Sequence, residues 1–249
     1  MKLFKYILSL NLLLIVFITL PAVGQSPDQI LAKIDSVQNA FSDMSATEQM
    51  KLIDEENRVK KRVVEIKQKG KELRMVRFLE PADVRGVGFL RLDSDRLYLY
   101  LPAFRKVRRI ASSATNENFM GTDFTYEDMS QSVYADDYIA RELSTQQGQY
   151  RLFLEPKPGA DVNYHHLVIH ADTSNFVLWK VEYHNRLEQK KELSIDNVEK
   201  IDGYWMGKMM RMVSLDENHE TVLELSDIQF DQGLSDSEFS ERSLKRPIR

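Results

Sequence analysis

The chain has 249 residues, no cysteine, and 38 acidic against 34 basic side chains, which gives a formal net charge of −4. The missing cysteines exclude thiol catalysis, disulfide bonds and the acylated N-terminal cysteine of a bacterial lipoprotein. The acidic balance disfavours nucleic-acid binding, and no glycine-rich phosphate loop or catalytic motif occurs, so we expect neither a cofactor nor an enzyme.

Residues 1–24 have the pattern of a secretory signal peptide. Two lysines precede an apolar run over residues 7–20, and the small-x-small sequence at 22–24 forms a cleavage site. We expect cleavage near Gly24 and Gln25 and export to the periplasm, with an uncleaved membrane anchor as the alternative. No linker rich in Pro, Gly or Ser divides residues 25–249, so we expect one domain there.

The mature chain begins with a predicted amphipathic helix. Residues 26–29 read Ser-Pro-Asp-Gln, which combines an N-cap, a first-turn proline and a capping-box glutamine. Ile30, Ile34, Val37 and Phe41 follow at helical spacing, which predicts about four turns with one apolar side.

From Ala46 onward, short apolar segments alternate with turn sequences, a pattern typical of antiparallel strands joined by hairpins. About a dozen strands predict a mainly β fold, one large meandering sheet or open barrel. The predicted strands are 47–54, 58–68, 72–79, 86–93, 96–101, 106–111, 149–155, 163–171, 176–185, 189–198, 204–214 and 220–230.

Two stretches interrupt this pattern. Residues 112–148 are predicted to form short helices and loops that lie over the sheet. Residues 235–244 are predicted to form a terminal helical turn that packs Phe239 and Leu244.

Histidines and carboxylates are the first candidates for chemistry. His165, His166 and His170 fall in one strand, but only His166 and His170 share a face, and a metal site needs three or four converging ligands. We therefore expect no metal. Asp123, Glu127 and Asp128 lie among aromatic side chains and methionines, which is more typical of an amphipathic cover than of acid–base catalysis.

A basic run at Arg105-Lys106-Val107-Arg108-Arg109 follows an apolar strand. One interpretation is a sheet edge that charge protects from aggregation. The other is a rim of cations, with Arg105, Arg108 and Arg109 docking an acidic partner or a lipid head group.

Large apolar side chains occur on both faces of several predicted strands. Val87 and Phe89 alternate with Leu90 and Leu92, and in 176–185 Phe176 and Leu178 oppose Val177, Trp179, Val181 and Tyr183. Such strands pack on helices with one face and line a core or a cavity with the other, and methionines adapt to ligands of variable shape. A plain two-layer core is the alternative. The predicted cavity and lid residues are Phe78, Phe89, Phe119, Met120, Phe124, Tyr126, Met129, Trp179, Trp205, Met210 and Met212.

Residues 76–130 resemble the outer-membrane lipoprotein-sorting proteins of the LolA-like superfamily. The resemblance rests on a Pro-x-Asp-x-x-Gly turn, a Tyr-x-Leu-Pro strand with a basic continuation, and an FMG-x-DF-x-YED element. The residues that carry it are Pro81, Asp83, Gly86, Tyr100, Pro102, Phe119, Met120, Gly121, Asp123, Phe124, Tyr126, Glu127 and Asp128.

The resemblance implies an open antiparallel half-barrel with an N-terminal helix and a helical and loop lid over its concave face. It also implies a monomeric periplasmic carrier whose apolar cavity accepts acylated lipoproteins or other lipids from an inner-membrane transporter of the ABC or RND type. The cargo would then pass to an outer-membrane acceptor. The alternative is an accessory periplasmic subunit of an inner-membrane export pump that carries no free cargo. We expect the aromatic side chains of residues 119–129 to form a lid over the cavity mouth.

Overall fold

The computed structural model describes residues 25–248, and the predicted signal peptide lies outside that range. Helix α1 (Pro27–Gln38) begins as predicted: Ser26 Oγ accepts from Gln29 N at 3.2 Å and Gln29 Oε1 accepts from Ser26 N at 3.0 Å. The helix is shorter than predicted, because Asn39 ends it with its backbone N–H donating to Asp35 O. Phe41 therefore lies beyond the helix, where it packs with Phe230.

One antiparallel sheet contains the thirteen strands of the described residues, in the spatial order β6-β5-β4-β3-β2-β1-β13-β12-β11-β10-β9-β8-β7. Strands β6 and β7 are its two free edges, so the sheet stays open and the predicted fold class is confirmed. The strands are β1 (Asp43–Ile53), β2 (Val59–Lys69), β3 (Leu73–Glu80), β4 (Gly88–Arg91), β5 (Leu97–Leu101), β6 (Lys106–Arg109), β7 (Tyr138–Gln146), β8 (Gln149–Pro156), β9 (His166–Asp172), β10 (Leu178–His184), β11 (Gln189–Ile201), β12 (Tyr204–Ser214) and β13 (His219–Phe230).

Strand β7 corrects the prediction that all of residues 112–148 form helices and loops. Only Tyr138 and Ala140 of β7 are buried, because an edge strand exposes most of its side chains. The usual apolar alternation is therefore missing from its sequence. The rest of the stretch is as predicted: η2 (Ser112–Ala114), η3 (Phe119–Gly121), α2 (Tyr126–Ser130) and α3 (Tyr134–Asp137).

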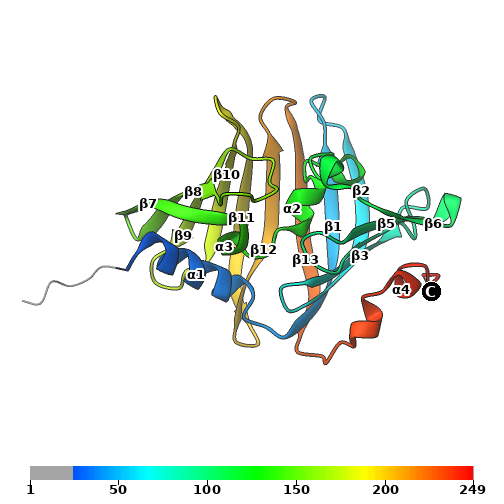
Figure 1. The fold of residues 1–249 in the computed structure, drawn as a ribbon. Helices are drawn as coiled ribbons and strands as arrows, with labels where there is room; N and C mark the ends of the chain where they lie inside the picture. Colours follow the sequence, from blue (N-terminus) through cyan, green and yellow to red (C-terminus); the bar gives the residue numbers. More distant parts are fainter. Residues whose placement is uncertain (1–24, 249) are drawn as a thin grey trace, which may run out of the picture.

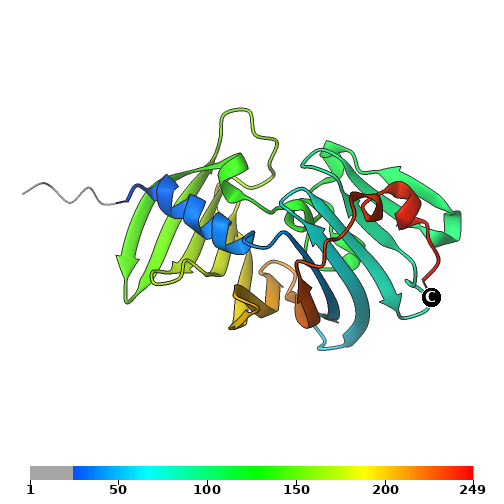
Figure 2. The same cartoon turned by 90° about the horizontal axis from the view of Figure 1, so that it is seen from below.

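The two faces of the sheet are covered by different parts of the chain (Figures 1 and 2). Helix α1 contacts α3, β7 and β12 on the concave face, and α2 lies near the middle of the sheet. The C-terminal turns η4 (Asp236–Glu238) and α4 (Glu241–Leu244) pack Phe239 and Leu244 against Leu90 on the other face. A Cβ on Gly88 would lie 2.6 Å from the end of the Leu244 side chain, so a larger residue there would require Leu244 to shift.

Side-chain alternation is as predicted in β4 and differs in β10. Phe89 joins the main core while Leu90 packs beneath the C-terminal turns. In β10 the register shifts between Leu178 and Lys180, so Leu178 shares the core face with Val181 and does not oppose it. The same bulge places Trp179 beside His170, with ring centroids 5.2 Å apart. No helix within residues 25–248 is long and apolar enough to cross a membrane.

Candidate functional site

Residues 119–130, called the signature segment below, fold into a tight loop followed by α2. Phe119 N donates to Phe124 O at 2.7 Å, and Thr122 N donates to Phe119 O at 3.0 Å. Met120 and Gly121 both have positive φ, at 51° and 74°, which explains the glycine. Thr125 then caps α2 through a capping box with Asp128.

Four aromatic rings close one end of the space beneath this segment. Phe119 lies 5.8 Å from Phe78, 5.6 Å from Phe89 and 5.7 Å from Tyr126, measured between ring centroids. Phe78, Phe89 and Phe119 are fully buried, and Tyr126 is nearly so. This closed end is solid core, and its four side chains do not line the cavity described below. Their role in a cavity or lid stays a prediction.

The other turns of the resemblance meet at the same closed end. Gly86 N donates to Phe78 O at 2.8 Å, and Val84 N donates to Pro81 O at 3.2 Å. Gly86 has φ 85°, and a Cβ there would lie 3.1 Å from the Pro102 ring. The Pro-x-Asp-x-x-Gly turn and the Tyr-x-Leu-Pro strand therefore pack on each other, and their glycine and prolines have a structural reason.

Three cationic side chains from three different strands hold the signature segment by its backbone carbonyls. Arg62 Nη1 donates to Met120 O at 2.6 Å, and Lys191 Nζ donates to Asp123 O at 2.8 Å. Arg74 Nη1 donates to Met129 O at 2.9 Å. Each bond satisfies a carbonyl that the short loop cannot pair internally.

Asp123 anchors the segment to β13. Its Oδ2 accepts from Thr221 Oγ1 at 2.7 Å and lies 2.7 Å from His219 Nδ1, while its own N–H donates to Thr221 Oγ1 at 3.0 Å. Asp123 is 1% exposed, so these partners replace the water that a carboxylate requires.

The other two carboxylates of the element are anchors as well. Asp128 accepts from Tyr164 Oη at 2.9 Å and pairs with Lys191 at 3.3 Å. Glu127 accepts from the Asn163 backbone N–H at 3.0 Å, and burial raises its pKa to about 7. Each carboxylate is committed to a separate partner, so they form no acid–base pair of the kind that hydrolases use.

A cavity of about 250 Å³ lies beneath the other end of the segment, which is called the open end below. Four residues of the predicted set line it: Phe124, Met129, Trp205 and Met210. Their role in ligand binding stays a prediction. The remaining apolar lining comes from α1, the following loop and seven strands or their flanks: Val37, Phe41, Met44, Ile66, Val76, Val177, Leu178, Leu193, Ile195, Met206, Leu223 and Leu225.

Three further residues of the predicted set lie away from this cavity. Met212 is fully buried in the main core, and Met120 packs against that core next to the Arg62 contact. Trp179 lies beside His170 because of the β10 bulge. Sequence alternation alone does not reveal such a bulge.

Several polar side chains of the cavity wall were not predicted, and three of them stand close together. Glu48, Gln68 and Arg74 stand on the neighbouring strands β1, β2 and β3, and all three line the cavity. Arg74 Nη2 donates to Gln68 Oε1 at 2.9 Å. Burial raises the pKa of Glu48 to about 8, although the charge of Arg74 opposes that shift, and burial lowers the pKa of Arg74 to about 10.

The sequence does contain a signal for these residues. Glu48 shares its strand face with the buried Met50 and Leu52, and Arg74 shares its face with the buried Val76 and Phe78. A charged side chain in the apolar phase of a strand indicates either a buried ion pair or a functional site.

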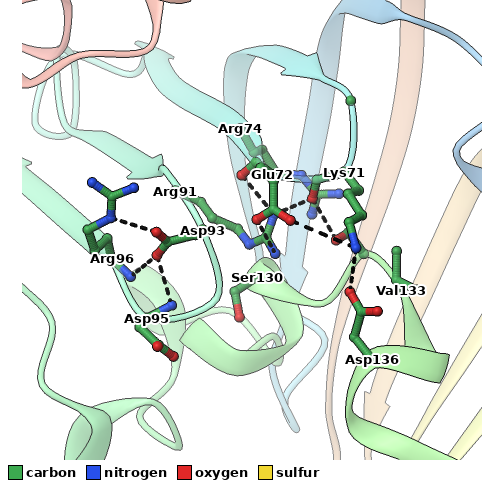
Figure 3. A network of polar contacts seen from close by, with 12 residues as sticks. Lys71, Glu72, Arg74, Arg91, Asp93, Asp95, Arg96, Ser130, Val133 and Asp136 are labelled. Carbon is green, nitrogen blue, oxygen red and sulfur yellow. Dashed lines mark hydrogen bonds and ion pairs between the residues drawn. The ribbon is translucent and has the colours of Figure 1, made fainter.

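A separate polar cleft of about 170 Å³ lies outside α2, and Figure 3 shows part of its network. Arg91 Nη1 donates to the carbonyls of Lys71 and, at 2.7 Å, of Glu72, and Lys71 Nζ lies 3.0 Å from Asp136 Oδ2. The basic side chains of this cleft thus join the β2–β3 turn to α3. These contacts give the polar cleft a structural role.

His166, His170 and His184 lie on the face opposite the main core. His170 Nε2 is 2.9 Å from Glu182 Oε1, and the His166 ring stacks on His184 at 4.3 Å. Within residues 25–248 no group of three or more His, Cys, Asp or Glu side chains is placed to hold a metal.

The basic run forms the edge strand β6 and the turn before it. Arg105 has a left-handed backbone with φ 52° after the turn η1 (Pro102–Phe104), and Phe104 is 68% exposed. Arg105, Arg108 and Arg109 are exposed, which fits the interpretation of a charged sheet edge. Their proposed docking role stays a prediction.

Comparison with known proteins shows which solved structures share this fold. The structure is similar to an outer membrane lipoprotein-sorting protein domain from Vibrio parahaemolyticus, at 27% identity and a TM-score of 0.79, with 88% of this chain and 98% of that chain covered. It is also similar to a DUF1329 family protein from Desulfovibrio piger, at 27% identity and a TM-score of 0.81, covering 88% and 97%. A LolA superfamily protein from Nitrosomonas europaea, at 18% identity and a TM-score of 0.74 over 88% and 100%, shares the fold.

The fold and its covered concave face thus define a LolA-like half-barrel protein. A family model described as "uncharacterized protein" matches residues 70–246, and the chain belongs to that family. No curated protein sequence matches the chain significantly.

Proposed function

We propose that this protein is a periplasmic carrier that holds the acyl chain of a lipoprotein or another lipid in the cavity at the open end and moves it toward the outer membrane. The observation that carries the proposal is the apolar cavity of about 250 Å³ between the signature segment and the sheet. The similarity to an outer membrane lipoprotein-sorting domain supports it.

The physical need for such a carrier is large. Each buried CH₂ is worth about 0.8 kcal/mol, so a long acyl chain crosses water only inside an apolar site. The cavity wall contains Met44, Met129, Met206 and Met210, whose flexible side chains suit chains of variable length and shape. The volume lies near the lower end of the range of about 300–1,000 Å³ for ligand sites, so a long chain requires the walls to move apart.

A matched pair of methionines on β12 tests the proposal. Met210 lines the cavity, whereas its neighbour Met209 is not part of the lining. Wild-type protein is expected to bind the neutral apolar fluorophore N-phenyl-1-naphthylamine, and Met210→Trp to reduce the affinity about tenfold or more by filling the cavity. Met209→Trp is the control and should bind like the wild type.

The measurement is fluorescence titration, with mass spectrometry of lipid retained by protein released gently from the periplasm. Absence of probe binding by the wild type together with absence of retained lipid would contradict the carrier function. Equal affinity in the two variants would show that the probe binds elsewhere, and the cavity would then lose its proposed role.

The alternative, an accessory subunit of an export pump, is favoured by a different feature. Phe104 is 68% exposed and is followed at once by the exposed cations of β6, a combination suited to docking on another surface. The donor in either case is proposed to be an inner-membrane transporter of the ABC or RND type. Retained lipid separates the two functions, because a pump subunit without free cargo has no reason to hold it.

A further inference from the structure

The polar part of the cavity wall has an unbalanced arrangement of charge. Glu48 is 3% exposed, yet within the described residues no hydrogen bond or ion pair reaches its carboxyl group, and only the charge of Arg74 acts on it from a distance. Its side chain faces the cavity, where Val64 and Leu225 flank it on the adjacent strands. Because a carboxyl group with little access to water and no partner in the chain is costly, a polar group that enters the cavity can stabilise it by hydrogen bonding.

Arg74 is the second half of this arrangement. Its guanidinium donates to two neutral acceptors, Gln68 Oε1 and Met129 O, both at 2.9 Å. These bonds fix the side chain in place and leave the charge without a counter-ion, since no carboxylate of residues 25–248 lies in ion-pair range of it. A guanidinium has five N–H donors in a planar fork, and further donors remain for a ligand.

The other charged group of the cavity wall is already neutralised. Asp128 pairs with Lys191 at 3.3 Å and also accepts from the Tyr164 hydroxyl and the Thr125 backbone N–H. The wall therefore presents one fixed, uncompensated positive charge and one carboxyl group. When that carboxyl group is protonated it is a hydrogen-bond donor.

This arrangement distinguishes among amphiphiles by their head groups. A cationic head is repelled by Arg74, and a neutral head leaves the guanidinium charge unpaired. A phosphate monoester carries more negative charge than one guanidinium balances. A carboxylate matches the single charge, accepts two N–H bonds from the fork, and has a lone pair left for the Glu48 hydroxyl.

We propose that the cavity selects single-chain amphiphiles with a free carboxylate, that is, unesterified long-chain fatty acids, with the head group between Arg74 and Glu48 and the tail among the methionines. This inference rests on the proposed carrier function and names its ligand class. An acyl chain esterified in a lipoprotein has no such head group, so the two ligand types are separable.

The test is displacement of N-phenyl-1-naphthylamine by four amphiphiles of equal chain length: hexadecanoate, methyl hexadecanoate, hexadecanol and hexadecyl phosphate. Hexadecanoate is expected to displace the probe from wild-type protein at a concentration about tenfold lower than hexadecanol or the methyl ester. Hexadecyl phosphate is expected to be weaker than hexadecanoate. Stronger displacement by the phosphate would overturn the carboxylate assignment.

Two variants test whether Arg74 and Glu48 cause the preference for hexadecanoate. Arg74→Met is expected to remove the preference for hexadecanoate and to leave hexadecanol displacement within about twofold of wild type. Glu48→Gln replaces the carboxyl O–H donor with a weaker amide N–H donor, so a preference reduced by a few-fold is expected. Glu65→Gln on β2, which is not part of the cavity wall, is the matched control and should behave as wild type.

The outcomes separate this inference from the carrier function. Equal displacement by all four amphiphiles overturns the head-group site and leaves the carrier intact. If none displaces the probe, both fail. Should Arg74→Met not fold, the wild-type series and Glu48→Gln still test the head-group site. An unchanged preference for hexadecanoate in Glu48→Gln would exclude a contact between Glu48 and the head group, and a reduced preference would support it.

Discussion

The closed end and the open end lie beneath the same twelve-residue segment, on the same face of the same sheet, yet one is solid and the other hollow. At the closed end Phe119 fills the space between Phe78, Phe89 and Tyr126, and rigid rings leave no gap. At the open end the lining includes four flexible methionines and the polar groups Glu48 and Arg74 among aliphatic and aromatic side chains.

The difference shows what keeps a cavity from collapsing. Apolar walls come together when nothing holds them apart, but polar groups that lose their water on collapse resist it. Arg74 also donates to Met129 O and to Gln68. These bonds hold the signature segment at a fixed distance from the sheet at the open end. The closed end supplies the rigid attachment, and the open end supplies the space.

The largest expected effect comes from breaking the closed end. Phe119→Ala removes a fully buried ring with three aromatic neighbours and should lower the free energy of unfolding by about 3–5 kcal/mol. Phe124→Ala, at the cavity wall, should cost less because one side of its ring faces empty space. Urea denaturation measures both, and equal losses would mean that the two ends do not differ in packing.

A somewhat smaller effect is expected at the anchor on β13. Asp123→Ala removes the buried carboxylate that pairs with Thr221 and His219, and the expected cost is about 3 kcal/mol because their polar atoms lose a buried partner. Asp161→Ala, at an exposed position, is the control and should change stability little. Hydrogen exchange of residues 119–130 should accelerate only in the first variant.

The next effect concerns the open end and depends on pH. The pKa of Glu48 is raised from 4.5 to about 8, so the folded protein keeps a proton that the unfolded chain releases between these values. Stability from this group is therefore lost as pH rises from about 4.5 to about 8, with a slope of at most about 1.4 kcal/mol per pH unit.

Glu48→Gln has no titrating group at position 48, so its stability relative to wild type should increase by about 3 kcal/mol between pH 5 and pH 8. Denaturation at the two pH values measures this change. Asp35 and Glu127 also have raised pKa values, about 6 and about 7, but they remain in both proteins and cancel in the difference. A relative stability independent of pH would mean that Glu48 is not buried away from water.

The sequence predicts the sheet well because, in most strands, apolar side chains alternate between a core face and a second face. It predicts α1 through the capping box at Ser26 and Gln29. It fails at β7, whose exposed side chains show no alternation, and at the β10 bulge, which turns Trp179 to the other face. Bulges and edges depend on neighbouring strands, which local sequence does not describe.

The site is predicted only in part for a related reason. Phe124 and Met129 lie at the cavity whereas Phe119 and Tyr126 lie in the core, although all four belong to one short motif. Composition cannot separate these roles, because both environments favour large apolar side chains. Glu48 and Arg74 were not predicted, although each interrupts an apolar strand face. In such sheets, a charged residue at an apolar position indicates a polar group in the cavity wall.

The smallest effect on stability is expected at the basic strand β6, which lies at a free edge of the sheet. Arg105, Arg108 and Arg109 are exposed, and changing all three to Ser should alter the free energy of unfolding by less than about 1 kcal/mol. The same charges steer association with an acidic surface over about 10 Å at moderate salt, so capture by inner-membrane vesicles should slow, most clearly at low salt. Sedimentation with such vesicles, at two salt concentrations and alongside thermal denaturation, measures both. A large loss of stability with unchanged capture would make the basic run part of the closed end after all, because its cations would then support the sheet edge and not a partner.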